Sequence, residues 1–174
     1  TALSETAEEK YEKSLQIIRG FHLPVKQSRF HYRTIASVAK TTLERQGGDD
    51  IRMSVGYITG MEERIELIAG RMYEDTGDEN LIEVIVNQEA LQKRDIFLDE
   101  ELVFEKVLNE KEEPLHVKIV GIFVPVDITD VYWTESQEDL SLEFFMTEEL
   151  FKDTFYSREH SGYEFKYDTL FDFH

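Results

Sequence analysis

Residues 70–91 read GRMYEDTGDENLIEVIVNQEAL, and this stretch decides the fold. It opens on Gly70 and Arg71, passes through a polar loop, and enters an apolar run at 81–86 that predicts a buried strand. Asn87 predicts the N-cap of a short helix, because its side chain can accept a hydrogen bond from an unpaired helical amide. A polar loop, a strand and a helix in so short a segment indicate a domain that mixes helices with a sheet.

The polar loop is rich in carboxylates, which raises the question of a calcium site. An EF-hand loop counted from Asp75 needs glycine at its sixth position and glutamate at its twelfth, but the chain has Asn80 and Val86 there. Another kind of calcium site stays open. The simpler prediction is a solvated turn around Gly77, since glycine and short polar side chains favour turns. The acidic side chains concerned are Glu74, Asp75, Asp78 and Glu79.

Strands are predicted on both sides of this stretch, wherever apolar and polar side chains alternate. The second half of 115–124 is apolar on both faces, which is typical of a covered central strand. A charged turn at 109–114 precedes it, and Thr147 predicts the cap of a short helix. The last strand has an aromatic face, so we expect it to be docked. The predicted strands are residues 51–57, 65–69, 102–108, 115–124, 139–146 and 163–173.

Two helices are predicted at the N-terminal end. The first lies within residues 1–20, carries one narrow apolar stripe and begins with a capping box of Thr6 and Glu9. The second covers residues 28–46 and ends where consecutive glycines allow a left-handed cap. Its common apolar face is formed by Tyr32, Ile35, Ala39 and Leu43.

The order of elements predicts an α+β fold with a mixed, mostly antiparallel sheet, two N-terminal helices and short helices between strands. We expect residues 1–20 to form a separate, stalk-like helix and residues 21–174 to form one α+β domain, with room for two small lobes. The chain starts at Thr1 without a methionine, which suggests a piece of a longer protein. It contains no apolar run long enough to span a membrane.

Charge limits the partners that the chain can have. Its 37 acidic residues against 19 basic ones leave a formal charge of −18. Such a surface repels the phosphates of nucleic acids and of anionic lipids, so neither is an expected partner. The chain has no cysteine, which excludes disulfides, thiolate nucleophiles and cysteine-type zinc sites.

No catalytic motif stands out. The sequence has no Gly-x-Ser-x-Gly elbow, no glycine-rich phosphate loop and no His-Glu-x-x-His pair. A pair of carboxylates of the glycosidase kind leaves no signature in a sequence, so that alternative stays open. We expect a protein that is not an enzyme and that binds no metal and no cofactor.

One loop suggests a partner contact. The segment 124–133 reads VPVDITDVYW and ends in Tyr132 and Trp133, the latter being the only tryptophan. Aromatic side chains at the tip of a loop are typical of binding surfaces. The alternative, which we favour, is that both rings fold back onto the core.

Three longer segments, taken together, resemble a known family. The segments are 65–91, 96–108, and 117–133 followed by 144–151, and their order resembles that of the motifs in the extracytoplasmic domain of MacB/FtsX-type ABC transporter permeases. The positions that match are Gly70, Arg71, Glu83 and Gly121. The chain departs from the pattern at Leu98-Asp99-Glu100, where the family often has Leu-Gly-Asp.

The resemblance implies a domain on the extracytoplasmic side of the cell membrane, inserted between the first two transmembrane helices of a permease. Its partners would be the transmembrane part of the same permease, an ATPase subunit, and an extracellular peptide or protein. Such a domain carries no catalytic residues and no cofactor, and it couples ATP-driven motion to export or to its extracellular partner. The alternative is a soluble module that binds a peptide or a protein.

Overall fold

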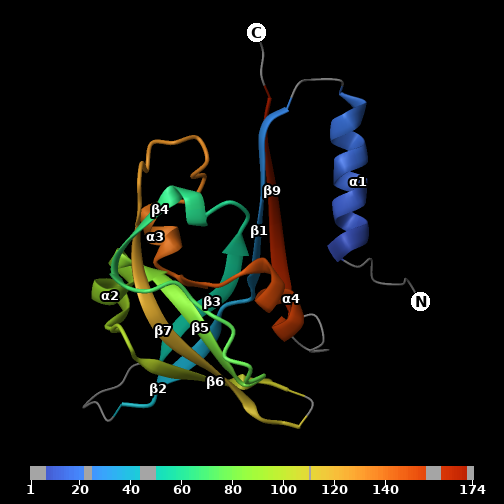
Figure 1. Cartoon of the computed structure of the whole chain (residues 1–174). Helices are drawn as coiled ribbons and strands as arrows, with labels where there is room; N and C mark the ends of the chain where they lie inside the picture. Colours follow the sequence, from blue (N-terminus) through green and yellow to red (C-terminus); the bar gives the residue numbers. More distant parts are fainter. Residues whose placement is uncertain (1–6, 22–24, 44–49, 110, 156–161, 172–174) are drawn as a thin grey trace.

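The computed structural model describes residues 7–21, 25–43, 50–109, 111–155 and 162–171 (Figure 1). Helices occupy the N-terminal end and three short segments, and strands form the rest of the regular structure. In chain order the elements are α1 (Ala7–Gly20), β1 (Val25–Thr34), β2 (Ser37–Thr41), β3 (Ile51–Ile58), η1 (Glu62–Arg64), β4 (Ile65–Gly70), β5 (Leu81–Asn87), α2 (Gln88–Arg94), β6 (Glu101–Leu108), β7 (Pro114–Pro125), α3 (Gln137–Leu140), β8 (Glu143–Phe145), α4 (Glu148–Phe155) and β9 (Tyr163–Phe171).

The strands pair in the order β2-β6-β7-β5-β8-β3, and β3 pairs again with β2, so the hydrogen bonds close into a ring. The β5–β7 and β3–β8 pairs are parallel and the other pairs of the ring are antiparallel. Closure removes the unpaired edges of an open sheet. The α+β class and the mixed, mostly antiparallel sheet are therefore confirmed.

Three strands, β1, β4 and β9, lie outside the ring, and β1 pairs with the ring strand β3. β4 pairs with the last part of β7, beyond the point where β6 ends. β9 pairs along the whole of β1, from Val25 opposite Phe171 to Thr34 opposite Tyr163. Figure 1 shows this β1–β9 ribbon standing beside the ring, with α1 next to it.

The ring is filled with apolar side chains. Phe104 lies edge-on to Phe144 and Phe123 edge-on to Phe145, with ring centroids 6.1 Å and 5.5 Å apart. α4 covers β3 and brings Phe151 against Tyr57. None of the side chains described in α1 is buried. None of the helices that the structure describes is long and apolar enough to cross a membrane.

The predicted second N-terminal helix is wrong. Residues 28–34 lie in β1 and residues 37–41 form β2, and both strands pair with β3. Tyr32 and Ala39 are seven residues apart, which would place them on one face of a helix, but they lie in separate strands and are both buried there. Ile35 and Leu43, which the helix would have placed on the same face, are exposed. Partners distant in the chain decide between the two periods here.

The predicted strand at 139–146 is shorter than expected. Residues 137–140 form α3 instead, and only Glu143–Phe145 remain as β8. Ser136 caps α3 through a capping box with Asp139, which outweighs the alternation of the segment. The capping box predicted for Thr6 and Glu9 involves a residue outside the described part of the chain.

The elements around residues 70–91 are confirmed. β4, β5 and α2 follow one another as predicted, and the Asn87 side chain accepts a hydrogen bond of 2.9 Å from the Glu89 amide. Thr147 likewise accepts from the amide of Leu150 at 3.0 Å and begins α4. The predicted last strand is β9, and positions 172 and 173 of that prediction lie outside the described part.

Candidate functional site

The positions on which the family resemblance rests form one joint between β4, β5 and β7. Gly70 and Gly121 face each other as partners in the β4–β7 pair. A Cβ atom on Gly70 would lie 2.2 Å from the carbonyl oxygen of Val120, and one on Gly121 would lie 2.2 Å from that of Arg71. Gly70 also has φ = +75°. Only glycine allows the two backbones to approach this closely.

Arg71 and Glu83 complete the joint. The guanidinium donates two hydrogen bonds, from Nη1 to Oε2 at 2.6 Å and from Nη2 to Oε1 at 2.5 Å. The Glu74 amide donates a third, of 3.0 Å, to Oε2. The hydrogen bond from Arg71 holds the pKa of Glu83 below its ordinary value, against the effect of burial. The joint therefore holds both ends of the acidic loop together.

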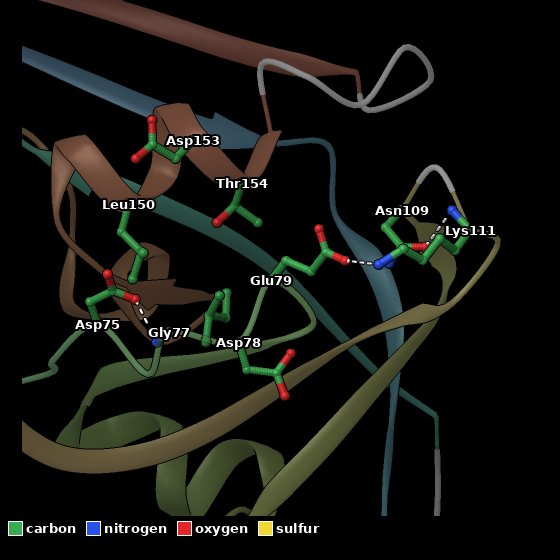
Figure 2. A pocket seen from close by; sticks show the side chains of 10 residues that line it. Asp75, Gly77, Asp78, Glu79, Asn109, Lys111, Leu150, Asp153 and Thr154 are labelled. Atoms are coloured by element: carbon green, nitrogen blue, oxygen red, sulfur yellow. Dashed lines mark hydrogen bonds and ion pairs between the residues drawn. The ribbon is translucent and has the colours of Figure 1, made fainter.

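The acidic loop lines a pocket of about 440 Å³, together with α4 and the β6–β7 turn. Figure 2 shows Asp75 turned to the Gly77 amide and Glu79 turned to Lys111. Asp75 accepts from the Gly77 amide at 2.8 Å, and Glu79 accepts from Lys111 Nζ at 2.7 Å. Asp78 accepts from the amide of Asn80 at 2.9 Å. Within the described residues, no cluster of histidine and carboxylate side chains is arranged to hold a metal ion.

Calcium should not stabilise the chain, because the described carboxylates of the acidic loop are not grouped in a way that could hold a metal ion. We expect millimolar Ca²⁺ to leave the melting temperature within about 1 °C of its value in chelator, since a ligand raises stability only by binding the native state. Differential scanning fluorimetry measures this directly, with Mg²⁺ as the control for ionic strength. A rise that saturates with Ca²⁺ and disappears in Asp75→Asn would show a real site.

A second polar cluster lies on the β1–β9 ribbon and is almost completely buried. His31 Nε2 lies 2.9 Å from both carboxylate oxygens of Glu143, and Nδ1 lies 3.2 Å from Glu135 Oε1. The side chains of His31, Glu135 and Glu143 are 4%, 8% and 2% exposed. A ring with a carboxylate at each nitrogen donates twice and is therefore an imidazolium.

Arg29 extends the cluster along β1. Its guanidinium contacts Glu135 at 2.5 Å and Asp168 of β9 at 3.2 Å. Lys166 lies 3.6 Å from the same two carboxylates. The cluster joins β1, β9 and β8 to the loop that precedes α3, and it leaves few charges without a partner of opposite sign.

Arg29 and His31 fall within the segment predicted as a helix, so the sequence pattern did not indicate this cluster. As a strand, the run Arg29-x-His31-x-Arg33 places three basic side chains on one face, and this is the signal that could have revealed it. Arg33 continues the face and pairs with Glu164 at 3.1 Å, although both side chains are exposed.

His31 should make stability depend on pH. Burial lowers its pKa, but the charge of Glu143 and hydrogen bonds to Glu135 and Glu143 outweigh burial and raise the pKa from 6.5 to about 9. Because the folded pKa lies above the unfolded one, the stabilisation is complete below about pH 6.5 and is lost as the pH rises through about 9. We expect the free energy of unfolding to fall by about 3 kcal/mol across this window. Urea titrations followed by Trp133 fluorescence measure it, and His31→Leu should flatten the dependence.

Tyr132 and Trp133, the predicted partner contacts, lie in the hydrophobic core with 2% and 8% of their surfaces exposed. Tyr132 donates a hydrogen bond of 3.0 Å to the Thr59 carbonyl, and the Arg64 guanidinium lies 4.5 Å from the centre of its ring. Burial raises the pKa of the Tyr132 hydroxyl, so it stays a donor. Of the two alternatives, the structure shows the rings folded back. Their aliphatic neighbours are exposed instead.

The solved structures that are similar to the chain include a permease domain and the periplasmic region of MacB. No protein-family model and no curated protein matches the chain. A domain of a putative permease protein from Porphyromonas gingivalis is 11% identical with a TM-score of 0.44, over 90% of this chain and 66% of that one. The periplasmic region of MacB from Actinobacillus actinomycetemcomitans is 12% identical with a TM-score of 0.41, over 92% of this chain and 81% of that region. The chain thus spans just under two thirds of the first structure. It is similar, over nine tenths of its length, to a permease domain and to the periplasmic region of MacB.

Proposed function

We propose that this chain is the non-catalytic extracytoplasmic domain of a MacB/FtsX-type ABC transporter permease. The observation that carries the proposal is the joint of Gly70, Arg71, Glu83 and Gly121. These are the four positions at which the sequence resembles that family, and they meet at one place in the fold. The structure explains each of these residues. The two glycines permit the close approach of the β4 and β7 backbones, and the Arg71–Glu83 ion pair fixes the acidic loop between β4 and β5.

The joint supports a scaffold rather than a reaction. Its polar atoms bond to each other, and its glycines meet backbone rather than open space. The domain would therefore act by its placement and movement, and not by catalysing a reaction. We propose that residues 1–20 are the stalk and that residues 21–174 move as the domain when the ATPase subunit drives the transmembrane part, which transmits the motion to export or to an extracellular partner.

Cysteine labelling of the full-length protein tests the location. The chain has no cysteine of its own, so a single introduced thiol reports one position. With any other cysteines of the protein replaced, Gln92→Cys on the exposed side of α2 should react with a membrane-impermeant maleimide in intact spheroplasts. Ala90→Cys in the same helix is the control, because Ala90 is completely buried and should react only after denaturation. Labelling of Gln92→Cys only after lysis would place the domain in the cytoplasm and end the proposal.

A soluble module for a peptide or protein is the second candidate, and the exposed aliphatic side chains beside Tyr132 favour it. Val126, Ile128 and Val131 are 67%, 44% and 63% exposed. The two candidates differ in the flanking sequence, since a permease domain requires an apolar span of about 20 residues on each side.

A further inference from the structure

One loop of this strongly acidic chain exposes three aliphatic side chains within six residues. We call residues 126–131, with Val126, Ile128 and Val131, the aliphatic loop. Figure 1 shows it in orange between β7 and α3, projecting next to β4 at one end of the ring. Single exposed aliphatic residues are ordinary on protein surfaces, but three grouped on one projecting loop need a reason.

The aliphatic loop is held in place by its own polar residues. Asp127 Oδ1 accepts from the Thr129 amide and hydroxyl at 2.8 Å and 2.6 Å. The Val126 amide donates to the Arg64 carbonyl at 3.0 Å, and the Arg64 guanidinium pairs with Asp130 at 2.7 Å. A loop that is ordered before it binds loses little entropy on binding. The hydrogen bonds therefore hold the aliphatic side chains in one exposed arrangement that a partner can contact.

Buried aromatic side chains anchor the same loop from below. Asp130 Oδ1 accepts from the Tyr132 amide at 2.9 Å, and the Trp133 amide donates to the Asp130 carbonyl at 3.0 Å. Tyr132 and Trp133 lie edge-on to each other in the core. Their burial fixes the direction in which the aliphatic side chains point away from the core.

Charge selects the kind of partner. Asp127 is exposed within the loop, and Glu63 and Glu66 are exposed on the neighbouring segment, which is joined to it by the pairing of Glu66 with Val124. The one basic residue in 59–66 and 124–135 is Arg64, and it already pairs with Asp130. An acidic rim repels a second copy of the same surface and an anionic membrane alike. It complements a basic rim.

We propose that the aliphatic loop is the docking site for a protein segment whose apolar side chains are flanked by lysine or arginine. The apolar side chains of the partner would cover Val126, Ile128 and Val131, and its basic residues would face Asp127 and Glu63. This inference rests on the proposed function, in which the domain meets an extracytoplasmic protein, and it identifies the contact surface and the chemistry of the partner.

The probe is a pair of amphipathic helical peptides with the same leucine pattern, one with lysine and one with glutamate at the polar positions. NMR titration of the chain should show shifts at 126–131 and at Glu63 and Glu66 with the lysine peptide and none with the glutamate peptide. Val126→Ser/Ile128→Ser/Val131→Ser should weaken binding at least about tenfold. The control Ile35→Ser/Leu43→Ser/Phe97→Ser removes apolar side chains that are 55%, 51% and 49% exposed elsewhere, and it should bind normally.

If the lysine peptide bound the two triple variants equally well, the interaction would be a nonspecific attraction to the acidic chain. That result would overturn the inference. So would shifts that avoid the loop, or no shifts at all. Loop-dependent binding to vesicles of phosphatidylglycerol, without binding to the peptide, would identify a membrane contact instead. The maleimide experiment reports location alone, so a domain that labels outside the membrane but fails here loses only this inference.

Discussion

Gly121→Ala should destabilise the chain by about 3 kcal/mol or more. The added Cβ would lie 2.2 Å from the carbonyl oxygen of Arg71 and 2.9 Å from Ile85 Cγ2. The carbonyl belongs to the backbone, so no rotamer change can relieve the contact. The strand β7 would have to move away from Arg71, which would also disturb the ion pair with Glu83. Urea unfolding followed by Trp133 fluorescence measures the loss.

Substitutions at two other glycines are controls that distinguish the cost of a close contact from the cost of backbone strain. Gly60 has φ = +75° with nothing within 4 Å of its Cβ position, so Gly60→Ala should cost about 1 kcal/mol from conformation alone. Gly20 has open space as well and no positive φ, so Gly20→Ala should be neutral or slightly stabilising. If Gly121→Ala were as stable as Gly20→Ala, the close approach of β4 and β7 would not exist in solution.

Glu143→Leu should cost about 3–5 kcal/mol, because it leaves the buried His31 cation with one carboxylate instead of two. His31→Leu should cost a similar amount, since it leaves the Glu143 carboxylate buried without its imidazolium. The double variant replaces both charges by apolar groups and should be more stable than the sum of the single losses predicts. Chemical unfolding of the four proteins at pH 6 gives the coupling free energy.

An exposed pair on the same ribbon provides the matched control. Arg33 and Glu164 form an ion pair of 3.1 Å with side chains 41% and 62% exposed. Glu164→Leu should change the free energy of unfolding by about 1 kcal/mol at most, because solvent screens the pair. A coupling near zero for His31 and Glu143, as for the exposed pair, would contradict the buried cluster.

The parts of the fold that could be predicted from the sequence are those with local causes. Asn87 caps α2 through an atom only two residues away, and Thr147 caps α4 in the same manner. The turn between β4 and β5 followed from Gly77, whose positive φ angle glycine tolerates. The capping box of Ser136 and Asp139 was equally local, and reading it would have corrected the strand predicted at 139–146.

The parts that could not be predicted depend on partners far along the chain. His31 lies 104 and 112 residues from the carboxylates that bind it, and Arg29 lies 139 residues from Asp168. Burial of a basic strand face is unfavourable unless carboxylates pair with it. It could therefore not be predicted without knowing which acidic residues lie next to it in the fold. For the same reason, the burial of Tyr132 depends on Thr59 and Arg64, which no local pattern connects to it.

The β1–β9 ribbon has a mechanical consequence. Val25 and Phe171 are opposite each other at one end of the ribbon, where the chain enters from α1 and leaves toward its C-terminal residues. A force that pulls these two residues apart would load the β1–β9 hydrogen bonds in the unzipping geometry, one pair after another. It would not load all of them together in shear. The end of the ribbon at Val25 and Phe171 would thus open at low force, and the Arg29–Asp168 ion pair would resist further opening toward the closed ring.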